Sequence, residues 1–566
     1  MKMSAYCFLP NPKLNPFPSR ILFLFFLIIL VFSPQAFAQT NVSGTISQNT
    51  TWTLAPMPPN NGSPYIVIGN ITVNPGVTLT IEPGVEVKFA GNYSLTVNGT
   101  LSAAGTSSQN IRFTSNQTTP ATGDWVGIRF LGSGTGTAQY SIIEYADKGL
   151  YLETATASIT NNTIRNNNNA VYVKGSSSSV TNNTISNNTE YAAVIEYPTG
   201  TITSPDFNSN TYSGNNPNGI HLIPGPSGYI DRSTTLTKDN APYIATENIN
   251  VLSYPGVPAV AMTIQPGVEI RFDPGFGLNF TTFGGGNVAL NAQGTQANPI
   301  VMISNAAAPA PGDWKGLYFS NATVGSLTSI DYLNLSYAGN SNTPAIFVDN
   351  VTQLFSISHS TIQNNSNKGF YILNSSVNLS NNTISNNAAE GIYIEGKFSA
   401  NVTNNTISNS GSYPVTLKSA MAGPGIPSLP LRPNLMGNTY SNNNPNLIRV
   451  TTIFTNNRFI MYHDLHLTKD TIDYEITENI LMQYGVTGTM TTLTVDPGVT
   501  VLFGPGAGLE VGGALNAQGT PSQPIVFTSN AAIKAPGDWI GLSFLYYGQG
   551  ELTVLDHCTV EYAGQG

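Results

Sequence analysis

An aspartate followed by a tryptophan recurs three times in this chain, and each pair comes directly after a glycine. The pairs are Asp124-Trp125, Asp313-Trp314 and Asp538-Trp539. A carboxylate at such a position either accepts hydrogen bonds from the backbone N–H groups of a turn or binds a cation. An indole exposed on a polar surface can stack on a sugar ring, because its ring system is large and apolar. The repeated motif therefore indicates either a structural turn or a binding site.

The residues that follow each tryptophan predict where its side chain points. Apolar residues alternate after each motif, at Ile128/Phe130, Leu317/Phe319 and Leu542/Phe544. Successive side chains of a strand point to opposite faces, so the tryptophans face outward if the strand already includes them. We therefore predict that Trp125, Trp314 and Trp539 contact carbohydrate. The alternative is that the preceding glycine starts a corner and that the indole packs beneath a loop.

The densest group of acidic residues is a candidate calcium site. It consists of Asp470, Asp473, Glu475 and Glu478. Calcium prefers oxygen ligands such as these carboxylates, whereas a solvated acidic face needs no ion. The second copy of this segment keeps only Asp239 and Glu247 at the matching positions. We expect a solvated face and no cofactor, with calcium as the alternative.

These motifs belong to a longer pattern that occurs three times. Residues 78–89 read TLTIEPGVEVKF, and related segments occupy 262–272 and 493–503. Each is followed by an isoleucine-rich stretch, then by Gly-Asp-Trp and by Tyr-Ala. Proline presets φ and glycine supplies a positive φ, so each Pro-Gly pair predicts a type II turn. Self-similarity of this kind is typical of solenoids.

A shorter period lies inside each long repeat. The sequence Asn-Asn-Thr-Ile at 161–164 returns 21 residues later at 182–185, and the second copy repeats in steps of 22 and 23 residues. Short apolar alternations between these points predict strands. Asparagine tolerates the left-handed conformation of tight corners and can stack in hydrogen-bonded ladders. We predict an all-β fold: a right-handed parallel β-helix, or solenoid, with about 22 residues per coil and three modules in one rod.

The repeats divide the chain into a leader and three modules. We assign residues 1–38 to a signal peptide, 39–235 to module 1, 236–466 to module 2 and 467–566 to module 3. Module 3 stops soon after Tyr562-Ala563, whereas the first two modules continue from that landmark through Asn-rich coils. A solenoid needs a capped end. We therefore expect module 3 to be incomplete at its C-terminus or to be followed by a further domain, and a surface anchor or secretion signal could lie in that missing part.

The N-terminal segment predicts export. Three basic residues precede the apolar run 21–32, and Ala36-Phe37-Ala38 fits a cleavage site. The run is too short for a comfortable membrane span. We expect an extracellular or cell-surface protein that meets a membrane only through this segment, if the segment stays uncleaved.

Composition excludes some partners. The chain has 21 basic and 30 acidic residues, and without the three basic residues of the leader its net charge is −12. An acidic chain without a basic cluster is a poor ligand for nucleic acid. Charged residues make up only 9% of the chain, which indicates a surface of Asn, Ser, Thr and Gly.

The motifs together carry a family resemblance. Modules that read Leu-Thr-Ile-x-Pro-Gly-Val, then Gly-Asp-Trp-x-Gly, resemble the exported right-handed parallel β-helix repeat proteins of the pectin-lyase-like superfamily. The resemblance covers nearly all of residues 40–566 and implies the fold. That fold hosts lyases, hydrolases, epimerases, adhesins and passive stalks, so it does not imply one activity.

Enzymes with this fold use motifs that the chain lacks. A polysaccharide hydrolase would carry clustered aspartates, a Gly-His-Gly and an Arg-x-Lys, and none of these occurs. A pectate-lyase-like site would need several carboxylates for calcium and an arginine or lysine as base. No matching arginine motif is present, although carboxylates from distant segments could still meet on neighbouring coils.

We therefore expect an exported, non-catalytic binding or structural protein with a glycan as its ligand. Two alternatives stay open: a polysaccharide lyase or epimerase whose site is assembled across coils, and a passive stalk for a missing C-terminal domain. An enzyme predicts three or more carboxylates and a base converging in one groove. A binding protein predicts exposed indoles or tyrosines aligned on one flank, and a stalk predicts neither.

Overall fold

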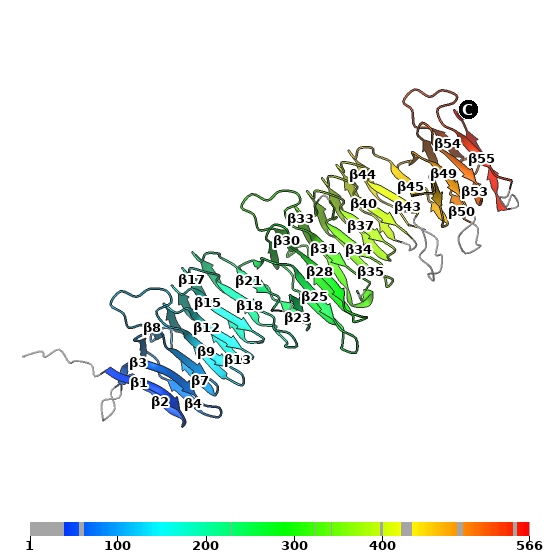
Figure 1. The fold of residues 1–566 in the computed structure, drawn as a ribbon. Coiled ribbons are helices and arrows are strands. Elements are labelled where there is room, and N and C mark those ends of the chain that lie inside the picture. Colours follow the sequence, from blue (N-terminus) through cyan, green and yellow to red (C-terminus); the bar gives the residue numbers. More distant parts are fainter. Residues whose placement is uncertain are drawn as a thin grey trace, which may run out of the picture. The chain divides into compact units, whose positions relative to one another are not determined.

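The fold is a stack of short parallel strands. A computed structural model describes residues 39–55, 62–226, 228–321, 323–340, 342–396, 400–419, 433–483, 491–546 and 552–564. The predicted signal peptide, residues 1–38, lies outside the described residues. Strands of successive coils lie side by side in sequence order (Figure 1). Every strand pair of the described chain is parallel except the hairpin formed by β45 and β46.

Strands from successive coils pair with one another and form seven stacks, which we call columns A to G. Three columns belong to the N-terminal coils. Column A contains β2 (Thr50–Trp52), β4 (Thr78–Ile81), β7 (Thr100–Ala104), β10 (Thr135–Gln139), β13 (Thr156–Thr160), β16 (Ser179–Thr181) and β19 (Asp206–Asn208). Column B contains β5 (Glu86–Phe89), β8 (Ile111–Ser115), β11 (Ser141–Glu144), β14 (Thr163–Arg165), β17 (Thr184–Ser186) and β20 (Thr211–Ser213). The long strand β3 (Gly62–Val73) starts both B and C, and β1 (Gln39–Ile46) pairs with it.

Column C runs through the first two modules. It contains β6 (Ser94–Val97), β9 (Gly127–Leu131), β12 (Lys148–Glu153), β15 (Asn169–Lys174), β18 (Ala193–Glu196), β21 (Ile220–Ile223), β24 (Tyr243–Ala245), β27 (Glu269–Phe272), β30 (Ile300–Ser304), β33 (Leu333–Ser336), β36 (Thr361–Gln363), β39 (Thr383–Ser385), β42 (Thr406–Ser408) and β44 (Thr439–Ser441). Column D contains β23 (Thr234–Leu236), β26 (Val260–Ile264), β29 (Val288–Gln293), β32 (Ser329–Asp331), β35 (Phe355–Ser358), β38 (Val377–Ser380) and β41 (Asn401–Thr403). A short 3-10 helix occupies Gly325–Leu327.

Column E starts at the end of the first module and runs through the second and third. It contains β22 (Tyr229–Ile230), β25 (Ile249–Ser253), β28 (Gly277–Thr282), β31 (Gly316–Phe319), β34 (Ile346–Asp349), β37 (Phe370–Leu373), β40 (Ile392–Glu395), β43 (Val415–Ser419), β45 (Ile448–Thr455), β48 (Tyr474–Ile476), β51 (Thr500–Phe503), β54 (Ile525–Ser529) and β57 (Cys558–Val560). Column F contains β46 (Arg458–Met461), β49 (Asn479–Met482), β52 (Gly508–Val511) and β55 (Gly541–Phe544). Column G contains β47 (Leu465–Leu467), β50 (Thr492–Val495), β53 (Ala514–Gln518) and β56 (Val554–Asp556).

Each coil crosses three columns, and the set of columns changes between modules. Coils of the first module cross A, B and C in that order, coils of the second cross D, C and E, and coils of the third cross G, E and F. The third strand of one module therefore pairs with the second strand of the next. This happens at β21 with β24 and again at β45 with β48. The coil path thus advances by one column at these two places, which lie close to the module boundaries predicted from the sequence.

The coil length predicted from the sequence holds where asparagine corners recur. Ile164 pairs with Ile185, and Ile362 pairs with Ile384, which are steps of 21 and 22 residues. Elsewhere loops lengthen the coil, so that Ile407 pairs with Tyr440, 33 residues later. The strand register tolerates these insertions because they lie at corners, outside the paired residues.

The Asn-Asn pairs fill two roles at each corner. The first residue of the pair, such as Asn161 or Asn182, has a φ of 58° and makes the turn in the left-handed region. The second residue is buried and bonds to its equivalent on the next coil: Asn162 Nδ2 donates to Asn183 Oδ1 at 3.0 Å. The Pro-Gly turns have the expected positive φ, for example 81° at Gly84. The predicted corner chemistry is therefore confirmed.

The core runs through the inside of the coils. In β12 the side chains of Leu150 and Leu152 are buried, while Tyr151 between them faces outward and is half-buried. This alternation repeats on strand after strand and forms one continuous hydrophobic cluster. Within the described residues, no helix has the length and apolar character needed to cross a bilayer.

Candidate functional site

The three repeated tryptophans lie in the core. The side chains of Trp125, Trp314 and Trp539 are fully buried. Each indole stacks on a phenylalanine of the preceding coil, with ring centroids 3.9 Å apart for Phe89–Trp125, 4.3 Å for Phe272–Trp314 and 4.1 Å for Phe503–Trp539. Each indole N–H also donates to a backbone carbonyl oxygen, of Glu144, Ser336 and Glu561 respectively. The expected outward orientation is wrong, and these buried rings present no face to a sugar.

A glycine explains why the tryptophan direction predicted from strand alternation is wrong. Two residues after each tryptophan comes Gly127, Gly316 or Gly541, with φ of 129°, 95° and 124°. A positive φ breaks the alternation of a strand, so the parity of Ile128 and Phe130 does not extend back to Trp125. The alternative reading, in which the indole packs beneath a loop, describes the structure.

The aspartate of the motif holds that loop. Asp124 Oδ2 accepts hydrogen bonds from Ser115 Oγ at 2.6 Å and from the Ala121 N–H at 3.0 Å. The same pair of contacts recurs in the second module, where Asp313 accepts from Ser304 and Ala310. The carboxylate thus closes the loop that leads from one strand to the next.

The acidic stretch at 470–478 is divided among separate partners. Asp470 accepts from the Tyr440 hydroxyl at 2.7 Å, Glu475 from the Tyr413 hydroxyl at 2.6 Å, and Glu478 from Arg449 at 2.7 Å. Burial raises the pKa of Asp470 against the opposing effect of the Tyr440 bond. Within the described part of the chain, the Asp473 side chain forms no hydrogen bond or ion pair with these three acids. Among the described residues, no three acidic, histidine or cysteine side chains gather closely enough to hold a metal ion.

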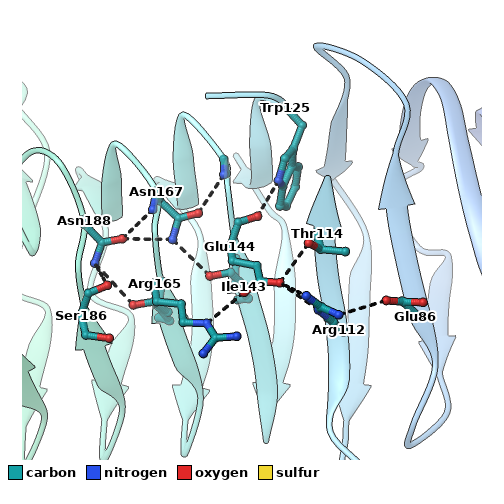
Figure 2. A network of polar contacts seen from close by, with 12 residues as sticks. Glu86, Arg112, Thr114, Trp125, Ile143, Glu144, Arg165, Asn167, Ser186 and Asn188 are labelled. Atoms are coloured by element: carbon teal, nitrogen blue, oxygen red, sulfur yellow. Dashed lines mark hydrogen bonds and ion pairs between the residues drawn. The ribbon is translucent and has the colours of Figure 1, made fainter. Parts of the chain in front are cut away.

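A carboxylate that the sequence did not single out lies at the centre of a charged network on column B. The Glu144 side chain is fully buried, and its Oε1 accepts from Arg112 Nε at 2.8 Å and from Thr114 at 3.0 Å (Figure 2). On the other side, its Oε2 accepts from Arg165 Nε at 2.9 Å. Arg112 also reaches Glu86 on the preceding coil, at 3.4 Å. Strand pairing brings these residues together from four successive coils.

The electrostatics of this network suit a structural ion pair. Burial by itself would raise the pKa of Glu144, but the hydrogen bonds from Arg112 and Arg165 outweigh burial and lower it. The carboxylate is therefore ionised and both of its oxygens are occupied. A fully buried group with both oxygens bonded can neither give a proton to a ligand nor take one. The second module has Ser336 at the equivalent place, so the pair is not a shared feature of the modules.

Two rows of outward-facing aromatic side chains form the second arrangement that the sequence reasoning missed. We call Tyr151 and Tyr172 of column C ladder 1. We call Tyr318, Phe347, Tyr371 and Tyr393 of column E ladder 2. Within each ladder the residues occupy paired register positions on successive strands. Adjacent ring centroids are 5.4 Å apart in ladder 1 and 4.9 to 5.4 Å apart in ladder 2.

Charged side chains border both ladders. Arg129 lies over the Tyr151 ring at 5.2 Å, Lys148 over Tyr172 at 5.7 Å, and Lys368 over Tyr393 at 4.9 Å. Cations over ring faces gain from the ring quadrupole. Among the described residues, Arg129 forms no ion pair, so its N–H donors remain available to a ligand.

Carboxylates also border each ladder. Three ladder phenols donate to an acid on the next coil: Tyr172 to Glu196 at 2.6 Å, Tyr318 to Asp349 at 3.0 Å and Tyr371 to Glu395 at 2.6 Å. Burial, and then the adjacent carboxylates, raise the pKa of all three phenols, that of Tyr318 to about 12. These phenols therefore stay protonated, and the carboxylates keep lone pairs that can accept hydrogen bonds from ligand hydroxyls.

A cleft opens beside ladder 1. It has a volume of about 300 Å³ and is lined by Val126, Arg129, Asp147, Lys148, Tyr151 and Tyr172. Lys148 and Asp147 pair at 2.9 Å. The cleft thus combines aromatic surface with both donors and acceptors in a small space, which is the usual composition of a small-molecule or sugar subsite.

The sequence does contain a signal for the ladders. Each rung is an aromatic residue between two aliphatic or aromatic ones, at 150–152, 171–173, 317–319, 346–348, 370–372 and 392–394. Reading these triplets as one apolar face concealed the fact that the middle side chain points outward. Strand parity finds the rungs once the flanking residues are assigned to the core.

Comparison with known families agrees with this architecture. A family model described as a right handed beta helix region matches residues 344–492. A second, described as a pectate-lyase like beta helix domain, matches twice, at residues 44–147 and 460–563. No curated protein and no solved structure matches the chain. Parallel coils, asparagine ladders and these matches agree: the chain is a right-handed parallel β-helix protein that carries pectate-lyase-like β-helix domains.

Proposed function

We propose that this chain is a non-catalytic β-helix protein that binds a neutral polysaccharide along its aromatic ladders, outside the cell or at its surface. The observation that carries the proposal is the pair of ladders with their charged borders. Tyrosine combines a large apolar ring with a hydroxyl and loses little side-chain entropy on binding, which suits it to contact surfaces.

The charge of the ladder borders favours a neutral ligand. At ladder 1, Lys174 lies 3.7 Å from Glu153 and 3.4 Å from Glu196, and at ladder 2, Lys418 lies 3.1 Å from Glu395. Acids and bases therefore pair along both ladders, and at ladder 2 Asp349 adds an acid that has no basic partner among the described residues. The chain as a whole is acidic, and an acidic chain repels polyanions at long range. A neutral glycan, by contrast, can donate its hydroxyls to the carboxylates.

The catalytic alternative has less support. It requires several carboxylates and a base in one groove, and the most deeply buried carboxylate of the network in Figure 2 is enclosed between two arginines outside any cleft described above. The cleft beside ladder 1 contains a single carboxylate, Asp147, which is paired with Lys148. The Glu144 network is suited to stabilising the fold and the cleft to binding a ligand, and neither presents a free acid and a free base to a substrate.

A binding panel tests this proposal. The purified chain is applied to immobilised dextran, galactomannan, xyloglucan, mixed-linkage glucan and β-1,3-glucan, with polygalacturonate as the acidic comparison. We expect binding to at least one neutral polysaccharide, no release of reducing or unsaturated ends, and a loss of at least about tenfold in affinity for the ladder variant Tyr151→Ala/Tyr172→Ala/Tyr371→Ala/Tyr393→Ala, which removes rungs from both ladders. Phe283→Ala removes an exposed aromatic ring outside the ladders and should bind as the unaltered chain does.

Two outcomes would overturn the proposal. Binding to none of the five neutral polysaccharides would leave the passive stalk as the better account. Equal binding by the ladder variant and the Phe283→Ala control would show that the ladders are not the contact surface.

A further inference from the structure

The two ladders lie on different columns of the solenoid. Ladder 1 belongs to column C, on the third strands of the first-module coils, and ladder 2 belongs to column E, on the third strands of the second-module coils (Figure 1). They occupy equivalent places in their own modules. The one-column advance at the pairing of β21 with β24 puts these equivalent places on different faces.

Neither column carries aromatic rungs through both modules. Beyond ladder 1, the register line of column C passes through Val194 and His221 and then through Ile244, Arg271 and Ile303. On column E the same line starts at Tyr229, and Asn250 and Asn279 separate that residue from Tyr318. Each ladder therefore ends on its own face, with aliphatic, amide or charged side chains beyond it.

A polymer on one ladder cannot continue straight onto the other. From Tyr172 to Tyr318 the pairing passes through five coil steps, which is roughly 24 Å along the stack at about 4.8 Å per strand. Over that distance the polymer would also have to turn a corner from column C to column E. On the register lines described above, one phenol lies between the ladders, that of Tyr229, and two asparagines separate it from Tyr318.

We propose that the chain bridges two separate polysaccharide strands, one on each ladder, and so acts as a cross-linker. This inference rests on the proposed function and adds that one protein molecule joins two polysaccharide strands. Two sites that face different directions on a rigid scaffold favour engagement of two ligands, because geometry prevents one short segment from occupying both.

Bead pairing tests the inference. Beads of two colours are coated with a polysaccharide from the five-member panel that binds the chain, mixed with the unaltered chain, and scored for mixed-colour pairs by microscopy. We expect pairing that rises and then falls with protein concentration, because excess protein saturates each bead singly. Tyr151→Ala/Tyr172→Ala and Tyr371→Ala/Tyr393→Ala should each still bind beads through the remaining ladder and should lose at least about tenfold in pairing. Phe283→Ala should pair beads as the unaltered chain does.

The outcomes separate this inference from the proposal on which it rests. Binding without pairing by the unaltered chain overturns bridging and leaves glycan binding intact. Pairing by either single-ladder variant at the full level also overturns it, since one ladder would then suffice, for example through self-association of the chain. No binding to any panel member removes both proposals together.

Discussion

The buried asparagine ladder offers the sharpest test of how the coils are held together. Asn183 is 1% exposed and lies between Asn162 and Asn210 of the adjacent coils. Its side chain makes four hydrogen bonds: Oδ1 accepts from the Asn162 N–H and from Asn162 Nδ2, and Nδ2 donates to the Ile159 carbonyl and to Asn210 Oδ1. All of these partners are buried.

Asn183→Ala removes all four bonds at once. A net hydrogen bond contributes about 1 kcal/mol, and a buried donor left without a partner costs about 1 to 3 kcal/mol. The other partners keep further bonds, as Asn162 Nδ2 does to the Ala138 carbonyl, and a water can enter the polar space that remains. We therefore expect a loss of about 3 kcal/mol. Asn208→Ala is the matched control, because Asn208 is exposed and should change stability by about 0.5 kcal/mol or less.

Hydrogen exchange measured by mass spectrometry reports the loss of stability in the individual coils around the substitution. We expect faster amide exchange in the coils around residues 155–190 in Asn183→Ala, together with a lower urea midpoint. Local exchange is the primary measurement because a long solenoid need not unfold in a single step. If the two alanine variants have equal exchange and equal midpoints, the ladder does not stabilise the coils and this reasoning fails.

Three further predictions concern charge, backbone and register. The pKa of Glu144 is lowered in the folded chain, so its ionised form stabilises the fold above the ordinary value of 4.5 and that contribution disappears as pH falls through the lowered pKa. Urea midpoints measured from about pH 7 to about pH 3 should therefore fall more steeply for the unaltered chain than for Glu144→Gln, and parallel curves would refute the ion pair. Gly127→Ala should lower the free energy of unfolding by several kcal/mol, because its φ is 129° and a Cβ would overlap the Lys148 carbonyl oxygen. Gly132→Ala should lower it by about 1 kcal/mol, because its φ is 59° and no atom lies near the added Cβ. Thermal denaturation of the two variants tests the difference. Because β21 pairs with β24, a chain with Cys558→Ser and His221→Cys/Ile244→Cys should form a disulfide under mild oxidation. The control with Cys558→Ser and His221→Cys/Asn250→Cys should not form one. The reverse result would contradict the column advance.

Strand periodicity made most of the fold predictable. Short steps between Asn-Asn pairs and the alternation of aliphatic residues are local signals, and both survive in the structure as corners and core-facing strands. The column advance could not be predicted in this way. It depends on which strand pairs across a long connection, as with β21 and β24, and no local pattern encodes that choice.

The candidate site was harder to predict for a related reason. The Trp125 prediction depended on strand parity, and a single positive φ at Gly127 reversed the inferred direction. The network around Glu144 is assembled from strands that are about 20 to 30 residues apart, so its members share no motif. The ladders were encoded in visible triplets such as 171–173, but these triplets predicted only strands and did not show that the middle tyrosine points outward. Outward aromatics are distinguished from core aromatics only after the coil register is known.

The central claim is that the outward tyrosines, and not the buried indoles, form the binding surface. The most direct test is to measure both the dissociation constant for the bound neutral polysaccharide and the melting temperature of Tyr172→Ala and Trp125→Phe, each made in a chain that carries Tyr371→Ala/Tyr393→Ala so that ladder 1 dominates binding. We predict that Tyr172→Ala weakens binding by about tenfold or more with little change in melting temperature. Trp125→Phe should lower the melting temperature through the lost hydrogen bond to Glu144 and the cavity it leaves, with an unchanged dissociation constant. Weakened binding by Trp125→Phe alone, with Tyr172→Ala unaffected, would contradict the account.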